Sequence, residues 1–250
     1  MNKYDSPTII KLDICDSTNE YIKKHYMKIQ DKFPLIITSP EQLKGRGRNN
    51  RKWFSPCGTG LYISMGFLMD NRQDLKLLSL IAGLSIAEAL ETISQKEFKL
   101  KWPNDVLYGK RKIAGVLIEN IINVNEIISI CGIGINLNQS QKDFPPGLRQ
   151  KATSLKMITG QAIDIDTVTI TLINTFFKWL AILEEGDKTK IIKMVNDLSV
   201  FSKGDPISFH HNNKIITGFF NEINREGGLI LEKKNGNRDI FYSGEINLEI

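Results

Sequence analysis

Two long apolar segments, 112–122 and 126–137, follow each other in the chain and constrain its fold more than any other feature. Both are rich in isoleucine, and only Asn123-Val124-Asn125 separates them, so we expect an antiparallel hairpin with its turn at these residues. Strands of this length need further strands beside them to be stable. We therefore expect a β-sheet at the centre of the molecule.

Other segments supply neighbours for this hairpin and helices to cover it. Apolar residues recur at helical spacing between Asp74 and Ile93, in the strongest helical pattern of the chain. Ser17 is expected to cap an earlier helix, with Glu20 completing a capping box three residues later. The remaining patterns predict strands at 34–39, 60–67 and 98–102, a helix from Asp166 to about Gly186, and a short helix at 190–198. Residues 1–200 should form an α+β domain, a mixed sheet backed by helices.

The pattern changes after about residue 200. Short strand patterns at 207–210, 214–221, 229–233 and 239–242 alternate with turn signals such as Gly227-Gly228 and Asn235-Gly236. This spacing predicts a second domain, a small β-barrel over residues 201–250.

Composition fits a globular protein. Of the 250 residues, 41% are hydrophobic and 24% are charged, which argues against disorder or low complexity. No uninterrupted apolar stretch reaches about 18 residues, the length of a membrane span. Residues 1–7 lack the apolar region of a secretion signal. We expect a cytoplasmic protein without membrane association.

Cysteine and histidine give little support to metal or disulfide chemistry. The three cysteines show no CxxC spacing, and the three histidines do not form an HExxH pattern. The net charge of +5 is mild but unevenly distributed. Five basic residues without an intervening acid lie between positions 44 and 52, namely Lys44, Arg46, Arg48, Arg51 and Lys52. Such a cluster indicates an anionic partner.

That basic segment carries the first chemical motif, Gln42-Leu43-Lys44-Gly45-Arg46-Gly47-Arg48, which runs on to Trp53 and Pro56. Glycines let the backbone approach a ligand closely, and guanidinium groups offer paired donors to phosphate or carboxylate oxygens. We interpret the segment as an anion cradle. A solvated basic loop or an RNA-contacting patch would show the same residues.

Three further motifs lie on the expected strands. Lys101-Trp102-Pro103-Asn104-Asp105 ends a strand at a proline, and Asp105 there would suit Mg²⁺ binding or orientation of an incoming amine. Lys112 enters an apolar strand three residues before Gly115, which leaves room for a ligand ring. Gly132-Ile133-Gly134-Ile135-Asn136 places an amide at the end of another strand. Without an evident nucleophile and base, this set suits positioning of charged partners, as in phosphoryl or nucleotidyl transfer from ATP.

At these residues the sequence resembles the biotin protein ligases, also called biotin–[acetyl-CoA-carboxylase] ligases. The resemblance covers about residues 13–138, and the small C-terminal barrel is similar to the SH3-like domain of that family. It rests on Asp16-Ser17-Thr18-Asn19, Gln42 with Gly45-Arg46-Gly47-Arg48, Arg51 with Trp53, Ser55-Pro56, Gly60-Leu61-Tyr62, Lys101-Trp102-Pro103-Asn104-Asp105, Lys112 with Gly115 and Glu119, and Gly134-Ile135-Asn136.

The resemblance implies a class II synthetase-like catalytic domain and a reaction in two steps. ATP with Mg²⁺ activates biotin to biotinyl-5′-AMP, and biotin then passes to a lysine of a biotin carboxyl carrier domain of acetyl-CoA carboxylase or a related carboxylase. It implies catalytic roles for Arg48, Lys112 and Asp105, with Mg²⁺ near Asp105. The implied biotin site is Ser17, Thr18, Asn19, Gln42, Arg46, Gly47, Arg48, Lys112 and Gly115, and the implied ATP site is Arg46, Arg48, Trp53, Asn104, Lys112 and Asn136.

Asn50 stands where many relatives have glycine, and asparagine tolerates left-handed backbone geometry, so the loop should keep its shape. Only 15 residues precede Asp16, too few for a winged helix-turn-helix, so we expect no DNA binding. A homodimer is possible. The alternatives are a lipoate or octanoate protein ligase, whose Arg-Arg-x-Ser-Gly-Gly-Gly type segment is absent, and a nucleic-acid-binding module.

Overall fold

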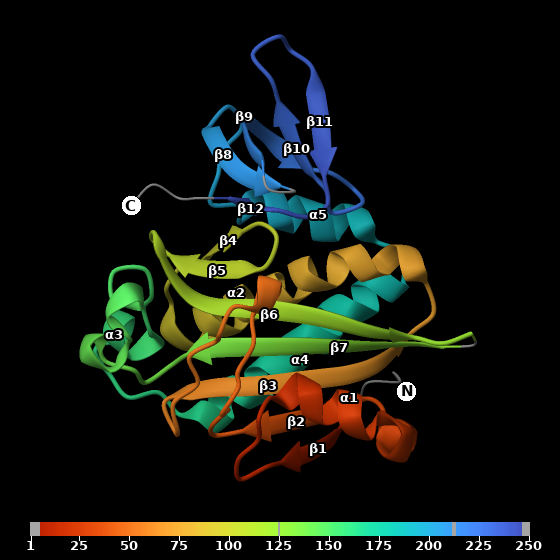
Figure 1. Cartoon of the computed structure of the whole chain (residues 1–250), viewed down its shortest axis with the longest axis vertical. Coiled ribbons are helices and arrows are strands. Elements are labelled where there is room, and N and C mark those ends of the chain that lie inside the picture. The colour runs from red at the N-terminus through yellow and green to blue at the C-terminus, as the bar shows by residue number, and fades with distance from the viewer. Residues whose placement is uncertain (1–5, 125, 212–213, 247–250) are drawn as a thin grey trace.

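The computed structural model describes residues 6–124, 126–211 and 214–246 (Figure 1). Its helices are α1 (Thr18–Ile29), α2 (Leu78–Ser94), α3 (Leu155–Thr159), α4 (Ile165–Glu184) and α5 (Lys188–Asp197). The larger sheet consists of β1 (Thr8–Lys11), β2 (Leu35–Ser39), β3 (Gly60–Met69), β4 (Lys99–Lys101), β5 (Asp105–Tyr108), β6 (Arg111–Ile122) and β7 (Ile127–Asn136). The smaller sheet consists of β8 (Pro206–His211), β9 (Lys214–Ile223), β10 (Leu229–Glu232), β11 (Arg238–Phe241) and β12 (Glu245–Ile246).

The larger sheet is mixed, as expected. Its strand order is β1-β2-β3-β7-β6-β5-β4, and only β1 and β2 run parallel. The two long apolar segments form β6 and β7, which pair antiparallel from Ala114 with Ile135 to Ile122 with Ile127. The expected turn includes residue 125, which lies outside the described residues.

Helices cover the two faces of this sheet differently. In Figure 1, α2 and α4 lie behind the sheet and α1 lies in front of it. Side chains alternate accordingly, because successive residues of a strand point to opposite faces. On β7, Cys131 and Ile133 join the core beneath α2 and α4, whereas Ile128 and Ile130 pack with Ile22 of α1. The fold class predicted from the sequence is therefore confirmed.

The apolar character of the two long helices follows from this packing. Residues 72–94, which include α2, and residues 165–184 of α4 have the length and composition of membrane spans. In the structure, 67% and 50% of their most apolar windows are buried inside the protein. They are the covering helices of a sheet.

An irregularity in β6 decides which way Lys112 points. Val106 of β5 pairs with Ala114, but Leu107 pairs with Lys112, so Ile113 is an extra residue, a β-bulge. Ile113 and Ala114 are both buried in the core under α2 and α4. The bulge therefore turns Lys112 to the opposite face, the face of Gly115, where regular alternation would have kept it in the core.

The smaller sheet has the order β11-β10-β9-β8-β12 and is antiparallel throughout. It joins the rest of the chain by hydrogen bonds from Trp102 Nε1 to Gly227 O, 3.0 Å, and from Asn196 Nδ2 to Ile223 O, 2.9 Å. A small C-terminal antiparallel sheet was expected. Its closure into an SH3-like barrel and the domain division at residue 200 remain predictions.

The structure corrects several local expectations. Strands β1, β5 and β12 and helix α3 were not foreseen, and the expected strand over 98–102 is only Lys99–Lys101. Helix α4 begins earlier than expected because Asp164, not Asp166, caps it by accepting from the backbone of Thr167. The carboxylate of Glu20, expected in a capping box, instead contacts the guanidinium of Arg46.

Candidate functional site

A cavity of about 630 Å³ opens on the face of the larger sheet that carries α1, and residues at the start of that helix line it. Residues from distant parts of the chain line it, and they include every site residue predicted from the sequence: Ser17, Thr18, Asn19, Gln42, Arg46, Gly47, Arg48, Trp53, Asn104, Asp105, Lys112, Gly115 and Asn136. The structure thus brings the predicted site residues together, while their individual roles remain predictions.

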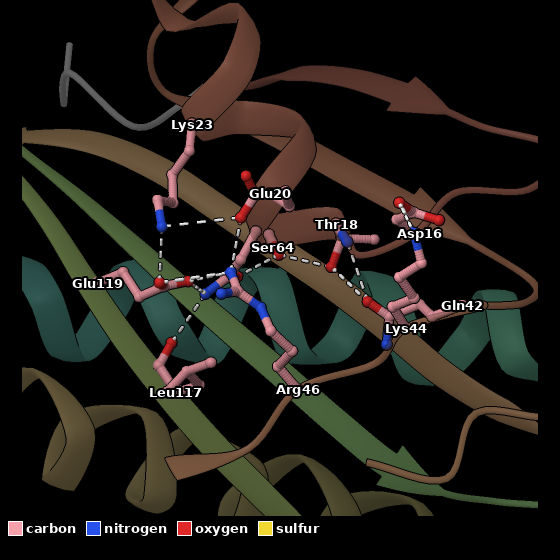
Figure 2. A network of polar contacts seen from close by, with 11 residues as sticks. Asp16, Thr18, Glu20, Lys23, Gln42, Lys44, Arg46, Ser64, Leu117 and Glu119 are labelled. Carbon is pink, nitrogen blue, oxygen red and sulfur yellow. Dashed lines mark hydrogen bonds and ion pairs between the residues drawn. The ribbon is translucent and has the colours of Figure 1, made fainter. Parts of the chain in front are cut away.

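One part of the lining is neutral and hydrogen-bonded, and we call Ser17, Thr18, Asn19 and Gln42 the polar wall. The backbone N–H of Thr18 donates to Gln42 Oε1 over 2.9 Å, and Gln42 Nε2 donates to Ser55 Oγ over 3.0 Å. Figure 2 shows the contact of Thr18 with Gln42. Ser17, Thr18 and Asn19 are each at most 5% exposed, so the wall is a preformed, desolvated surface.

Another part of the lining is cationic, and we call Arg48, Lys101 and Lys112 the cationic set. Arg48 Nη1 donates to Asn104 Oδ1 over 3.0 Å, and Asn104 Nδ2 donates to Val116 O over 2.9 Å, which fixes the guanidinium against β6. Lys112 Nζ lies 2.5 Å from Asp105 Oδ1. Three cations beside one carboxylate leave a positive region for an anionic ligand.

The pKa of Lys101 reflects its burial first and the neighbouring charges second. Burial lowers the pKa of the Lys101 ammonium below its usual range, Asp105 opposes that shift, and Lys112 adds to it. A phosphate or carboxylate would relieve the repulsion between the two ammonium groups.

The arginine-rich segment forms a folded loop. Its ends are held by hydrogen bonds from Gly47 N to Arg51 O, 2.7 Å, and from Trp53 N to Gly45 O, 2.9 Å. At its tip Asn49 and Asn50 adopt left-handed φ angles of 55° and 57°. Asparagine is tolerated in this conformation. Asn50 therefore adopts the left-handed geometry considered for it, and the conservation of the loop shape stays a prediction.

The indole of Trp53 lies across the strands that form the floor of the cavity. A side chain at Gly134 would come within 2.3 Å of Trp53 Nε1, and one at Gly115 within 3.0 Å of the same ring. The bare glycine surface, expected to admit a ligand ring, is therefore covered by Trp53. Trp53 Nε1 is buried and makes no hydrogen bond within the described structure.

The C-terminal sheet also reaches the cavity. Glu245 and Ile246 of β12 contribute to its lining. Both oxygens of Glu245 accept hydrogen bonds from the guanidinium of Arg51 in the arginine loop. This pairing lowers the pKa of the Glu245 carboxyl. The cavity is thus bounded by both sheets.

A family model described as the Biotin/lipoate A/B protein ligase family matches residues 12–136, half of the chain. The chain belongs to this family.

Individual relatives of this ligase family match 83–99% of the chain. The Bifunctional ligase/repressor BirA of Escherichia coli is 28% identical over 249 residues, 99% of this chain and 76% of BirA. The Biotin--[acetyl-CoA-carboxylase] ligase of Paracoccus denitrificans is 29% identical over 222 residues, 83% of this chain and 90% of that protein. The structure of biotin protein ligase from Aquifex aeolicus in complex with biotin and ATP has a TM-score of 0.82 and 32% identity, covering 96% of this chain and 97% of that one.

Sequence reasoning about the ligase site overlooked several residues. Ser64 is a single serine within an apolar strand, and Glu245 lies 194 residues from its partner Arg51. Neither carries a local signal. Lys101 and Glu119 were within recognised motifs but were not assigned to the site. The proximity of Glu119 to Asn19 arises only from the pairing of β6 with its neighbours beneath α1.

The described residues contain no group of three or more His, Cys, Asp and Glu side chains suited to hold a metal ion. Asp105 and Glu245 are the carboxylates that line the ligase cavity. Mg²⁺ usually takes one or two protein carboxylates and completes its shell with water and substrate phosphates. Asp105 fits that arrangement for an ion that enters with a nucleotide.

Proposed function

We propose that this chain is a biotin protein ligase. In the first step, a carboxylate oxygen of biotin attacks the α-phosphorus of ATP, the bond to the β-phosphate oxygen breaks, and biotinyl-5′-AMP and pyrophosphate form. The observation that carries this proposal is the single cavity that joins a neutral polar wall to a cationic set. A cyclic urea and an anionic mixed anhydride need these two surfaces side by side.

In the second step, a lysine amine of an acceptor protein attacks the carbonyl carbon of the anhydride. The amide bond forms, the amine loses a proton, and AMP departs. Two of the relatives support this assignment because BirA and the Paracoccus protein are named as ligases, the latter of acetyl-CoA carboxylase. We propose the biotin carboxyl carrier domain of that enzyme, or of a related carboxylase, as the acceptor.

The cationic set would act on the first step. Arg48 and Lys112 neutralise the repulsion between the biotin carboxylate and the α-phosphate and stabilise the charge that develops in the transition state. Arg46 and Gly47 close the arginine loop around the same ligand. Asp105, next to Lys112, would orient the attacking amine in the second step.

The remaining lining would bind the two substrates. The polar wall pairs the ureido group of biotin, which is costly to bury without hydrogen bonds. Trp53 and Asn136 would contact the nucleotide, with Asn104 holding Arg48 in place. Mg²⁺ bound with ATP would be held by Asp105 and would neutralise charge on the phosphates.

The test is ATP–pyrophosphate exchange by the purified chain with Mg²⁺, comparing biotin, lipoate and octanoate. We expect exchange with biotin alone. Exchange with lipoate or octanoate instead would assign the chain to the other branch of its family. No exchange with any acid, together with nucleic-acid binding that persists at high salt, would replace the ligase by a nucleic-acid-binding module.

Transfer is tested separately by incubating the chain with biotin, ATP and a purified carrier domain. Labelling of one lysine is the expected result, and its replacement by arginine should abolish labelling. We further propose that the protein acts in the cytoplasm without binding DNA or membranes. A homodimer would require pairing at an exposed edge such as β1, which sedimentation at micromolar concentration would reveal.

A further inference from the structure

Glu119 of β6 is the junction of the polar contacts beneath α1 (Figure 2). Its Oε2 accepts from Asn19 Nδ2 over 2.9 Å, and its Oε1 lies 3.0 Å from Lys23 Nζ. Arg46 Nη2 lies 3.3 Å from Oε2 and 2.8 Å from Glu20 Oε2. Burial raises the pKa of Glu119, but its bond to Asn19 and the charges of Lys23 and Arg46 lower it overall. Glu119 is therefore an ionised group that only accepts hydrogen bonds.

This carboxylate determines the orientation of the Asn19 amide. Asn19 Nδ2 donates to Glu119 and, over 3.3 Å, to Leu117 O, so both of its partners are acceptors without protons. A flipped amide would place Oδ1 against two oxygen acceptors. The amide lies flat on β7, where a side chain at Gly132 would come within 2.3 Å of Asn19 Oδ1. Asn19 Oδ1 is thereby fixed toward Ser64.

The fixed amide in turn sets the direction of the hydroxyl protons. Ser64 Oγ, fully buried, lies 2.6 Å from Asn19 Oδ1 and 2.6 Å from Thr18 Oγ1. A hydroxyl carries one proton, and Asn19 Oδ1 has none, so Ser64 donates to Asn19. The short contact between the hydroxyls then requires Thr18 to donate to Ser64, rather than to Gln42 Oε1 at 3.2 Å.

The result is a wall that presents acceptors to the cavity. The proton of Thr18 is directed inward, which leaves lone pairs of Thr18 Oγ1 available to a ligand. Gln42 Oε1 receives the backbone N–H of Thr18 and keeps a second lone pair. Both residues line the cavity. A ligand head group with N–H donors fits this polarity, and one that presents oxygen there meets repulsion.

We propose that Glu119 is a positioning residue that sets the hydrogen-bond polarity of the polar wall and thereby selects carboxylic acids whose head group carries N–H donors. It contacts neither reacting atom in the proposed reaction and acts through Asn19, Ser64 and Thr18. This proposal rests on the proposed function, because biotin carries two ureido N–H groups and lipoate carries none.

The experiment compares two ligands of the same shape: biotin, and a cyclic carbamate analogue in which oxygen replaces one ureido N–H. Calorimetry on the full chain gives both dissociation constants. The wild type should prefer biotin by at least about 100-fold, because a site whose acceptors pair with a ligand N–H rejects an analogue of the same shape that lacks this N–H. In Glu119→Gln, biotin affinity should fall about 10- to 100-fold and this preference should shrink about tenfold, because the amide lets Asn19 turn.

Exchanging the amide and the carboxylate between positions 19 and 119 separates the effect of hydrogen-bond polarity from the effects of charge and packing. Asn19→Asp alone places two carboxylates together and should bind biotin worst. In the double variant Asn19→Asp with Glu119→Gln, the new amide donates to Asp at position 19, whose other oxygen accepts from Ser64 as before. Net charge is restored and Ser64 again donates to position 19, while an oxygen now faces Leu117 O in place of Asn19 Nδ2. The double variant should therefore recover part of the affinity and of the preference that Asn19→Asp loses.

Glu88→Gln serves as the matched control. Glu88 lies on α2, and its carboxylate also accepts hydrogen bonds from a lysine ammonium, that of Lys178, and from a neutral N–H group, the indole of Trp179. It should leave both dissociation constants unchanged. Failure of the wild type to bind biotin would overturn the proposed function. Normal wild-type binding with an unchanged ratio in Glu119→Gln, or no recovery in the double variant, would overturn the polarity proposal alone. The polarity proposal would also be overturned if Glu119→Gln lost thermal stability but kept the wild-type ratio of the two dissociation constants.

Discussion

Lys112 reaches the cavity only because β6 carries one extra residue at Ile113. The bulge turns the side chain out of the core, and Asp105 on the neighbouring strand then holds its ammonium. A charge placed in this way is fixed before the ligand arrives, so little reorganisation is needed when negative charge develops. Its effect should therefore appear in the chemical step more than in binding.

Replacing Lys112 by alanine should accordingly slow adenylation. The loss of transition-state stabilisation is expected to be about 2–4 kcal/mol, or roughly 30- to 1,000-fold in rate. Pyrophosphate release at saturating biotin and ATP measures it. Lys178→Ala, which removes an exposed lysine paired with Glu88, is the comparison variant. Pyrophosphate release by Lys112→Ala at the wild-type rate would contradict the assigned role.

The indole of Trp53 should respond to ligand binding. Its Nε1 is buried without a partner in the described structure, and its ring covers Gly115 and Gly134. An unsatisfied buried donor is costly, so a ligand that offers an acceptor or displaces the ring should move the indole. Biotin with ATP should change the tryptophan emission, and Trp53→Phe should remove that change. Persistence of the signal in the variant would assign it to Trp102 or Trp179.

At the scale of elements, the arginine loop depends on the two left-handed asparagines at its tip. A β-branched residue at Asn50 would cost about 1–2 kcal/mol in this conformation, whereas glycine adopts it freely. We expect Asn50→Val to increase proteolysis of the loop and weaken biotin binding several-fold. Asn50→Gly should bind as the wild type does. Equal protease sensitivity of the two variants would show that backbone conformation at this position is unimportant.

The elements also show what local pattern can and cannot predict. Helix α2 was foreseen because its apolar residues recur at helical spacing, and the β6–β7 hairpin because both strands are long. Strand β5 was missed because Asn104-Asp105 looks like a turn, and its four residues are strand only through pairing with β4 and β6. Strand β1 is equally short and lies at a sheet edge.

Local sequence pattern also decided which residues of the site could be predicted. Motif residues such as Arg48 and Lys112 were identified because glycine, charge and strand pattern coincide around them. Ser64 and Glu119 could not be assigned, because their importance comes from contacts with α1 made over 45 and 100 residues of sequence. Such pairings depend on sheet order, which single-sequence patterns do not specify.

At the scale of the whole molecule, the pair of Arg51 and Glu245 joins the arginine loop to the C-terminal sheet. Their side chains are 64% and 32% exposed, so the pair itself should contribute about 1 kcal/mol or less. Glu245→Gln should raise the KM for ATP about two- to fivefold with little change in kcat. Arg51→Ala should have a similar effect, and the double variant should add little, since both remove one contact. Additive effects would show that the two residues act separately.

The alternation of side chains along β7 has a consequence for the tolerance of this protein to mutation. Cys131, Ile133 and Ile135 face the core, whereas Gly132, Gly134 and Asn136 face the ligand cavity or the groups that shape it. A saturation scan of these positions, scored once for cellular abundance and once for biotinylation per molecule, should therefore split into two interleaved profiles. Substitutions at the odd-numbered positions should lower abundance, and substitutions at the even-numbered positions should lower activity. Stability and catalysis would then depend on alternate residues of the same strand.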